Sequence, residues 1–253
     1  MAMASEMEKI LADILICPKP CNDGTVEITI SSGLTKTMPC PVIASDCLHG
    51  ERMEQALDRY VTGVMSNIGV PCRHLENFTE MLRIEALEEV GKWQWRGFLI
   101  ITGKTGSGKS FSAARAVHKY LRRLADNRFD NRTWGNIERA GNSIVWCAAM
   151  DISCDRDTSA RAKCERLAVI DDLGDEPDTS LGQSSLCGVI LKRHDMKLPT
   201  VITTTLTMMD IDVRYGCRVA DKLTEDIGKG GMIVEFGDAS IRAACSADRR
   251  ERI

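Results

Sequence analysis

A glycine-rich segment near the middle of the chain has the residue types and the spacing that bind nucleotide phosphates. Residues 103–110 read GKTGSGKS and match the pattern G-x-x-x-x-G-K-S/T. In such a loop the backbone N–H groups point into one concavity, the lysine contacts the β- and γ-phosphates, and the last hydroxyl binds Mg²⁺. The expected phosphate-binding residues are Gly103, Lys104, Thr105, Gly106, Ser107, Gly108, Lys109 and Ser110. Among them, Lys109 is expected to contact phosphate and Ser110 to bind the metal ion.

An acidic pair after an apolar run is the second candidate for chemistry. Residues 167–170 are apolar and lead directly into Asp171 and Asp172. An acidic residue at the carboxyl end of a strand is typical of a Walker B motif, whose first carboxylate holds Mg²⁺ directly or through water. We therefore expect Asp171 to bind Mg²⁺ and Asp172 to orient or deprotonate the attacking water. The alternative for Asp172 is a solvent-facing acid that starts the next turn.

These motifs need a sheet that brings them together, and the sequence contains candidate strands for it. Apolar and β-branched runs occupy residues 98–101, 144–148, 167–170, 199–205 and 231–236. Helical patterns alternate with these runs, which predicts an α/β fold with a parallel sheet covered by helices on both faces. A strand at 199–205 beside the strand at 98–101 would present a polar side chain to the γ-phosphate. The polar residues 126–142 are expected to form a connection.

Close pairs of cysteines near the N-terminus suggest a separate metal site. The pairs have the spacings Cys-x3-Cys and Cys-x6-Cys and flank an alternating, β-patterned segment, as in a zinc ribbon with four thiolates around one Zn²⁺. The expected ligands are Cys17, Cys21, Cys40 and Cys47. Because these spacings are looser than the usual two-residue knuckles, His49 could replace Cys47, and Cys72 and His74 are further candidates. Four cysteines without a metal are the alternative.

The chain is expected to contain two domains. An amphipathic helix over residues 53–68 is followed by Gly69 and Pro71, which mark a boundary near residues 69–78. We place a zinc-ribbon-like domain at residues 1–76 and the nucleotide-binding domain at 77–253.

Composition limits the possible surroundings and partners. The net charge of −3 and the pI near 5.9 argue against strong binding of duplex DNA by the whole surface. These values still allow a local basic groove. No apolar run approaches the ~18 residues of a transmembrane helix. The first residues lack the basic region of a signal peptide. We therefore expect a cytoplasmic protein with no membrane partner, in which clustered cysteines bind metal rather than form disulfides.

Taken together, these motifs resemble the AAA+ ATPases of the DnaC/DnaI helicase-loader group and the related IstB transposition ATPases. The resemblance covers roughly residues 65–243. Besides the two phosphate-site motifs, it rests on Gly69-Val-Pro71 with Asn77-Phe78, on the run 199–205, on residues 215–223 (YGCRVADKL), and on Phe236 ahead of Ile241-Arg242. The N-terminal cysteines are similar to the zinc module that precedes the ATPase in some of these loaders.

The resemblance implies roles for residues outside the phosphate motifs. Thr205 corresponds to sensor 1, Arg218 to the arginine finger that reaches a neighbour's nucleotide, and Arg242 to the sensor 2 arginine. Arg214 is the alternative finger. Asp172 stands where most AAA+ proteins have Glu, Thr205 where they commonly have Asn, and Lys222 where many relatives have Arg. These departures imply slow hydrolysis that depends on assembly or on DNA.

The function implied by the resemblance is that of an ATP-dependent loader. Such a protein forms homo-oligomers through its ATPase domain, binds a hexameric DnaB-type replicative helicase through its zinc domain, and places the helicase on single-stranded DNA. Its cofactors would be ATP, Mg²⁺ and Zn²⁺. The alternative is an IstB-like ATPase that assists a transposase on duplex DNA. A small-molecule kinase, which would need an arginine-rich lid, and a GTPase, which would need Asn-Lys-x-Asp, fit the sequence less well. A non-catalytic adaptor stays open.

Overall fold

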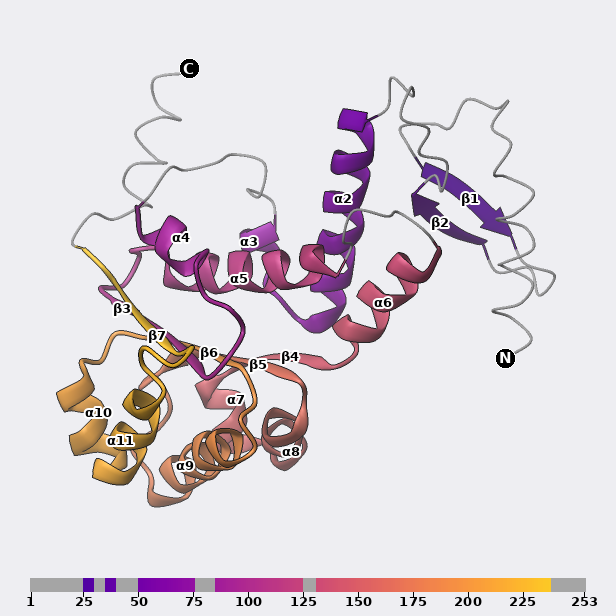
Figure 1. Cartoon of the computed structure of the whole chain (residues 1–253). Coiled ribbons are helices and arrows are strands. Elements are labelled where there is room, and N and C mark those ends of the chain that lie inside the picture. Colours follow the sequence, from indigo (N-terminus) through magenta and orange to yellow (C-terminus); the bar gives the residue numbers. More distant parts are fainter. Residues whose placement is uncertain (1–24, 30–34, 40–49, 76–84, 125–130, 238–253) are drawn as a thin grey trace, which may run out of the picture. The chain divides into compact units, whose positions relative to one another are not determined.

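A parallel sheet of five strands carries the glycine-rich loop in the part of the chain that the structure describes (Figure 1). The strands are β3 (Phe98–Gly103), β4 (Ile144–Ala148), β5 (Leu167–Leu173), β6 (Thr200–Thr204) and β7 (Met232–Phe236). They lie side by side in the order β4-β5-β6-β3-β7, and every neighbouring pair is parallel. The strand that contains residues 200–204 therefore lies beside β3, as the sequence predicts. The predicted α/β fold with a parallel sheet is confirmed.

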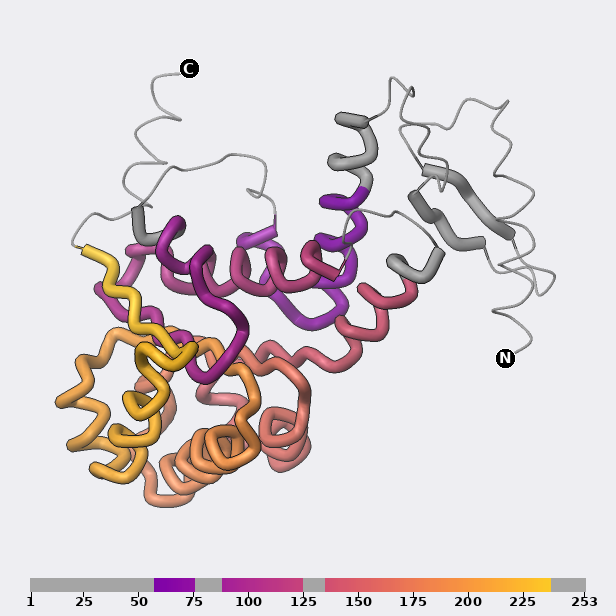
Figure 2. Tube along the Cα trace, in the orientation of Figure 1, coloured from indigo at the N-terminus to yellow at the C-terminus, as the bar shows by residue number. Residues whose placement is uncertain are grey.

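The computed structural model describes residues 25–29, 35–39, 50–75, 85–124 and 131–237, and side chains within 57–75, 88–124 and 135–237 (Figure 2). The chain divides into two compact units. One comprises Met1–Asn67 with Tyr120–Gly141, and the other Ile68–Lys119 with Asn142–Ile253. The predicted domains 1–76 and 77–253 stay a prediction.

Helices cover both faces of the sheet in the second unit (Figure 1). One face carries α7 (Ala149–Cys154), α8 (Arg156–Cys164), α9 (Ser180–Asp195), α10 (Met208–Tyr215) and α11 (Cys217–Glu225). The other carries α3 (Cys72–Leu75), α4 (Glu85–Val90) and the first part of α5 (Lys109–Arg123). Alternate residues of β3 are buried on opposite faces, so that Phe98 and Ile100 join the core beneath α9 to α11. Burial on both faces explains why the strands are continuous apolar runs.

The first unit contains the helix α2 (Gly50–Ile68), the end of α5 and α6 (Asn131–Gly141). Leu57, Val61 and Met65 recur every four residues on α2 and are fully buried, which confirms the predicted amphipathic helix. A short antiparallel pair, β1 (Thr25–Thr29) and β2 (Thr35–Pro39), precedes α2 in the sequence. The expectation of a plain connection over 126–142 is wrong, because α6 occupies most of it. No described helix is long and apolar enough to cross a membrane.

Candidate nucleotide-binding site

The glycine-rich loop joins the end of β3 to the start of α5 and takes a conformation that requires its glycines. Gly106 and Gly108 have φ angles of 82° and 99°, in the left-handed region that side chains disfavour. A Cβ on Gly103 would lie only 2.7 Å from the carbonyl oxygen of Phe236. Because α5 begins at Lys109, the unpaired N–H groups of its first turn lie directly after the loop. This combination creates a place for an anion.

Lys109 lies across the loop. Its side chain is only 6% exposed, and its Nζ donates hydrogen bonds to the carbonyl oxygens of Gly103 (2.8 Å) and Lys104 (2.9 Å). An ammonium group has three hydrogens, so one donor remains for a phosphate oxygen. Burial lowers the pKa of Lys109, while the carboxylates of Asp172 and Asp171 act in the opposite direction. The acidic pair is therefore close enough to influence the charge of the lysine.

Two further loop residues test whether a phosphate group fits. Ser107 is 2% exposed, and its Oγ has no hydrogen-bond partner among the described residues. An unsatisfied buried hydroxyl costs about 1–3 kcal/mol, which a ligand oxygen could recover. Ser110 is half-buried in the first turn of α5, whereas Lys104 and Thr105 are exposed at the tip of the loop. The loop thus has an unused polar atom for a phosphate oxygen.

The acidic pair interrupts the regular pairing of β5 with β6. Pairing shifts register between Ile170 and Leu173, and Asp172 takes a φ of 56°. Asp171 is 4% exposed, and its Oδ1 accepts a hydrogen bond from Thr203 Oγ1 at 2.6 Å. The same Thr203 oxygen accepts the backbone N–H of Asp172 at 2.9 Å. One hydroxyl therefore fixes the orientation of both acidic residues.

The two carboxylates differ in their electrostatic surroundings. The pKa of Asp172 is raised, first by burial and then by the negative charge of Asp171. The positive charges of Lys109, Arg73 and His74 oppose this shift. A carboxylate whose pKa is raised accepts a proton more readily, which suits a general base.

Thr203 was missed by the sequence analysis, which selected Thr205. Thr205 follows the end of β6 and is exposed, and its role as sensor 1 stays a prediction. The pairing register of β5 with β6 is what identifies Thr203. Because Ile202 pairs with Ile170, residue 203 comes next to the start of the acidic pair.

The two candidate arginine fingers have opposite surroundings. Arg218 is exposed on α11 and makes no hydrogen bond or ion pair with the part of the chain that the structure describes. Arg214 instead donates from Nε to the buried Glu176 Oε1 at 2.9 Å, and from Nη2 to the Glu176 carbonyl at 2.6 Å. Arg214 is therefore committed within its own chain, whereas Arg218 is available to another molecule.

Solved structures that are similar to this chain include proteins of DNA replication. The DnaC helicase loader matches over 60% of this chain and 86% of its own, with 16% identity and a TM-score of 0.41. DnaI matches over 62% of this chain and 80% of its own, with 13% identity and a TM-score of 0.40. AMPPCP-bound DnaA from Aquifex aeolicus matches over 67% of this chain and 48% of its own, with 14% identity and a TM-score of 0.41. No family model and no curated protein matches the chain. At these identities, a shared activity does not follow from the matches.

The expected zinc ligands Cys17, Cys21, Cys40 and Cys47, together with His49 and Arg242, lie outside the described residues. Within the described residues, no group of three or more His, Cys, Asp or Glu side chains could hold a metal ion, and Cys72 is an exposed free thiol. A magnesium site does not need such a group. Mg²⁺ usually keeps several waters and takes its other ligands from one or two protein oxygens and from substrate phosphates. Ser110 and Asp171 are the oxygen donors that fit this role.

Proposed function

We propose that this protein is an ATPase in which residues 103–110 hold the triphosphate and the acidic pair acts on the γ-phosphate. Two observations together support this most. The loop admits only glycine at Gly103, and the charges of Asp171 and Asp172 act to raise the pKa of Lys109, against the effect of burial. A Mg²⁺ ion held there would supply positive charge against the negative charge of the phosphates. Ser110 and Asp171 would hold that ion.

The chain's own residues would divide the remaining work. Lys109 would donate its third N–H to a phosphate oxygen, while its two hydrogen bonds to the loop keep its side chain in place. Asp172 would orient the attacking water and accept its proton. Thr203 would hold the carboxylate of Asp171 and the backbone of Asp172. Thr205 and Arg242 would report the nucleotide state as sensors 1 and 2.

We infer that hydrolysis requires a second copy of the chain. Arg218 is exposed, charged and without a partner among the described residues, whereas the phosphate loop has no arginine of its own. An arginine offered by a neighbour neutralises transition-state charge only when the subunits assemble. Nucleotide would then act as an assembly signal as well as a substrate.

We propose that this cycle serves helicase loading. Residues 1–76, with Zn²⁺ on the four N-terminal cysteines, would bind a hexameric DnaB-type helicase in the cytoplasm, and the assembled ATPase units would hold it open around single-stranded DNA. The sequence motifs shared with the DnaC/DnaI group support this assignment, as does the absence of a strong overall positive charge.

The nucleotide site is tested with Lys109→Ala. A ligand present at 100 times its Kd stabilises the folded state by about 2.7 kcal/mol. We expect Mg-ATP to raise the Tm of the wild type accordingly and to leave that of Lys109→Ala unchanged. Lys229→Ala, which removes an exposed lysine away from the loop, is the matched control. Equal stabilisation of Lys109→Ala and the wild type would contradict the site.

The partner is tested with the full chain as bait. We expect it to retain a replicative helicase and to bind single-stranded DNA better than duplex DNA when ATP is present. Retention of a transposase with preference for duplex DNA would favour the IstB-like alternative. We expect Cys17→Ser to lose about one zinc per chain, measured by metal analysis. This variant should no longer retain the helicase but should still bind nucleotide.

A further inference from the structure

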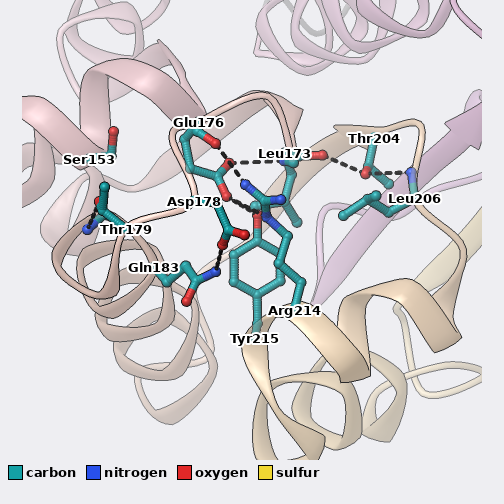
Figure 3. A network of polar contacts seen from close by, with 12 residues as sticks. Ser153, Leu173, Glu176, Asp178, Thr179, Gln183, Thr204, Leu206, Arg214 and Tyr215 are labelled. Atoms are coloured by element: carbon teal, nitrogen blue, oxygen red, sulfur yellow. Dashed lines mark hydrogen bonds and ion pairs between the residues drawn. The ribbon is translucent and has the colours of Figure 1, made fainter.

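A buried carboxylate lies between the acidic pair and the helix that carries Arg218. Glu176 follows β5 in the loop before α9, and its side chain is fully buried. Its Oε2 accepts the backbone N–H of Gly174 at 3.0 Å. Its Oε1 accepts both Arg214 Nε and the hydroxyl of Tyr215 (Figure 3). One side chain therefore joins the end of β5 to the last turn of α10.

The β5 end of this connection is conformationally constrained. Asp172 has a φ of 56° and Gly174 one of 109°, and a Cβ on Gly174 would lie 2.8 Å from the side chain of Leu206. Thr204 Oγ1 donates to the carbonyl of Leu173 at 2.6 Å and accepts the N–H of Leu206 at 3.0 Å (Figure 3). Leu173, which lies between Asp172 and Gly174, is therefore tied to β6 through its carbonyl.

The helix end of the connection leads directly to Arg218. Arg214 and Tyr215 are the last residues of α10, and Gly216 links them to α11 with a φ of 87°. Gly216 is also the residue whose carbonyl accepts the N–H of Val219 in the first turn of α11. Only two residues separate Tyr215 from Arg218, so the position of Tyr215 fixes the start of the helix that presents the arginine.

The contacts of Glu176 with Arg214 and Tyr215 are strong enough to keep β5 and α10 joined. A buried charge is retained only when it is paired and hydrogen-bonded, and Glu176 has Arg214 as its ion partner. Burial, followed by the hydrogen bond to Glu176, raises the pKa of Tyr215, so its phenol remains a donor. Hydrogen bonds to charged groups are roughly twice as strong as neutral ones.

We propose that Glu176 is a positioning residue that couples the acidic pair to the placement of Arg218. The inference rests on the proposed ATPase function and adds to it a path within one chain from its own nucleotide to the arginine it offers a neighbour. When phosphate and metal move Asp172, Gly174 and Glu176 follow, and Arg214 and Tyr215 carry the start of α11 with them. Glu176 itself does not touch the nucleotide.

The test is hydrogen–deuterium exchange of the full-length protein, with and without Mg²⁺ and the analogue AMPPNP. In the wild type we expect nucleotide to protect residues 103–110 and to change exchange in residues 217–225 by about fivefold or more, the size of a typical coupling between sites. Glu176→Gln keeps the shape but cannot accept hydrogen bonds from Gly174, Arg214 and Tyr215 together. We expect it to keep the protection of 103–110 within about twofold and to lose the response of 217–225.

Gln183→Ala is the matched control, because it removes a hydrogen bond to Asp178 in the same loop (2.5 Å) without touching Glu176. It should respond as the wild type does. If Glu176→Gln fails to fold, Tyr215→Phe removes one of the same contacts and should weaken the response of 217–225. A wild-type response in both Glu176→Gln and Tyr215→Phe would overturn the coupling. Protection of 103–110 without any response of 217–225 in the wild type would overturn it and leave the nucleotide site intact, whereas no protection of 103–110 would overturn both.

Discussion

Strands β5 and β6 have a buried charged group at each end, and the two ends are built differently. Near their amino ends, Arg193 of α9 is fully buried, and no carboxylate among the described residues bonds to it. Its Nε donates to Thr200 Oγ1 at 2.7 Å, and its other nitrogens donate to the carbonyls of Ala162, Glu165 and Pro199 at 2.6–2.9 Å. Burial lowers the pKa of Arg193 to about 10, so it remains charged at neutral pH.

At the carboxyl end of β5, and in the loop that follows the neighbouring strand β3, the polar groups are only partly satisfied by hydrogen bonds. Asp172 has a left-handed φ and a raised pKa, and the Ser107 hydroxyl has no partner among the described residues. Among the described residues, Lys109 donates only to carbonyls of its own loop. Local strain and unused polar groups tend to gather where a ligand binds.

A charge that stabilises the fold has its hydrogen bonds satisfied within the chain, whereas a charge that serves a ligand keeps some unsatisfied. Arg193 uses four donated hydrogen bonds to join α9 to the end of α8 and to the start of β6, so its charge stabilises the fold. Lys109 and Asp172 are held in place by their neighbours but retain capacity for a further partner. Mutations should therefore affect stability at one end of the strands and activity at the other.

The largest effect is expected from Arg193→Met. The substitution removes the donor from the buried carbonyl of Ala162 and from the partly buried carbonyls of Glu165 and Pro199, and a buried group left unsatisfied costs about 1–3 kcal/mol. We expect the free energy of unfolding to fall by about 3 kcal/mol or more, measured by urea denaturation. Arg166→Met, at an exposed arginine nearby, should change it by less than about 0.5 kcal/mol. A stable Arg193→Met variant would remove the distinction between the two ends.

Arg218→Ala should affect activity alone. The side chain is exposed, so we expect an unchanged urea midpoint and unchanged nucleotide binding. Assembly-dependent hydrolysis should fall by about 10³-fold, the low end for an arginine finger. Phosphate release at increasing protein concentration measures this loss. Turnover equal to that of the wild type would remove Arg218 from its role. Arg214→Ala should differ by also losing stability, because it leaves Glu176 as a buried charge without its ion partner.

Thr203→Val tests both stability and activity at the acidic pair. Valine keeps the volume but removes the hydroxyl that joins Asp171 to the backbone of Asp172. We expect a loss of about 1–2 kcal/mol in the free energy of unfolding and about tenfold slower hydrolysis. Thr205→Val should leave stability unchanged within about 0.5 kcal/mol, because that side chain is exposed. The relative hydrolysis rates of the two variants then show which threonine supports the chemistry.

The parts of the site that the sequence predicts depend on local patterns. The glycine-rich loop, the strand before it and the acidic pair after an apolar run are each encoded within about ten residues, so a single stretch of sequence is sufficient to identify them. The alternation of strands and helices likewise predicts the parallel sheet, because the apolar runs are buried on both faces.

The parts that the sequence analysis missed depend on contacts between distant residues. Thr203 acts through the register of β5 with β6, and Glu176 acts through Arg214, which is 38 residues away. Neither register nor loop contacts can be derived from residue spacing alone. Helix α6 was missed for a different reason: polar and charged residues outnumber apolar ones in its sequence, and Ile137 and Ala140 are the buried apolar side chains among those that the structure describes there.

The smallest effect, and a test of sign, is expected from Asp172→Asn. A carboxyl group whose pKa is raised in the folded state binds more protons there than in the unfolded chain, so stability falls as pH rises from its ordinary value of 3.8 through the raised one. Asparagine removes this penalty and tolerates the left-handed φ of 56°. We therefore expect Asp172→Asn to be more stable than the wild type at pH 7, with the difference shrinking towards pH 4, while hydrolysis is lost. Urea denaturation across this pH range measures the difference. Asp178→Asn, at an exposed carboxylate in the following loop, should show no such trend. If Asp172→Asn were less stable than the wild type at pH 7, the charge of Asp172 would stabilise the fold, as that of Arg193 does.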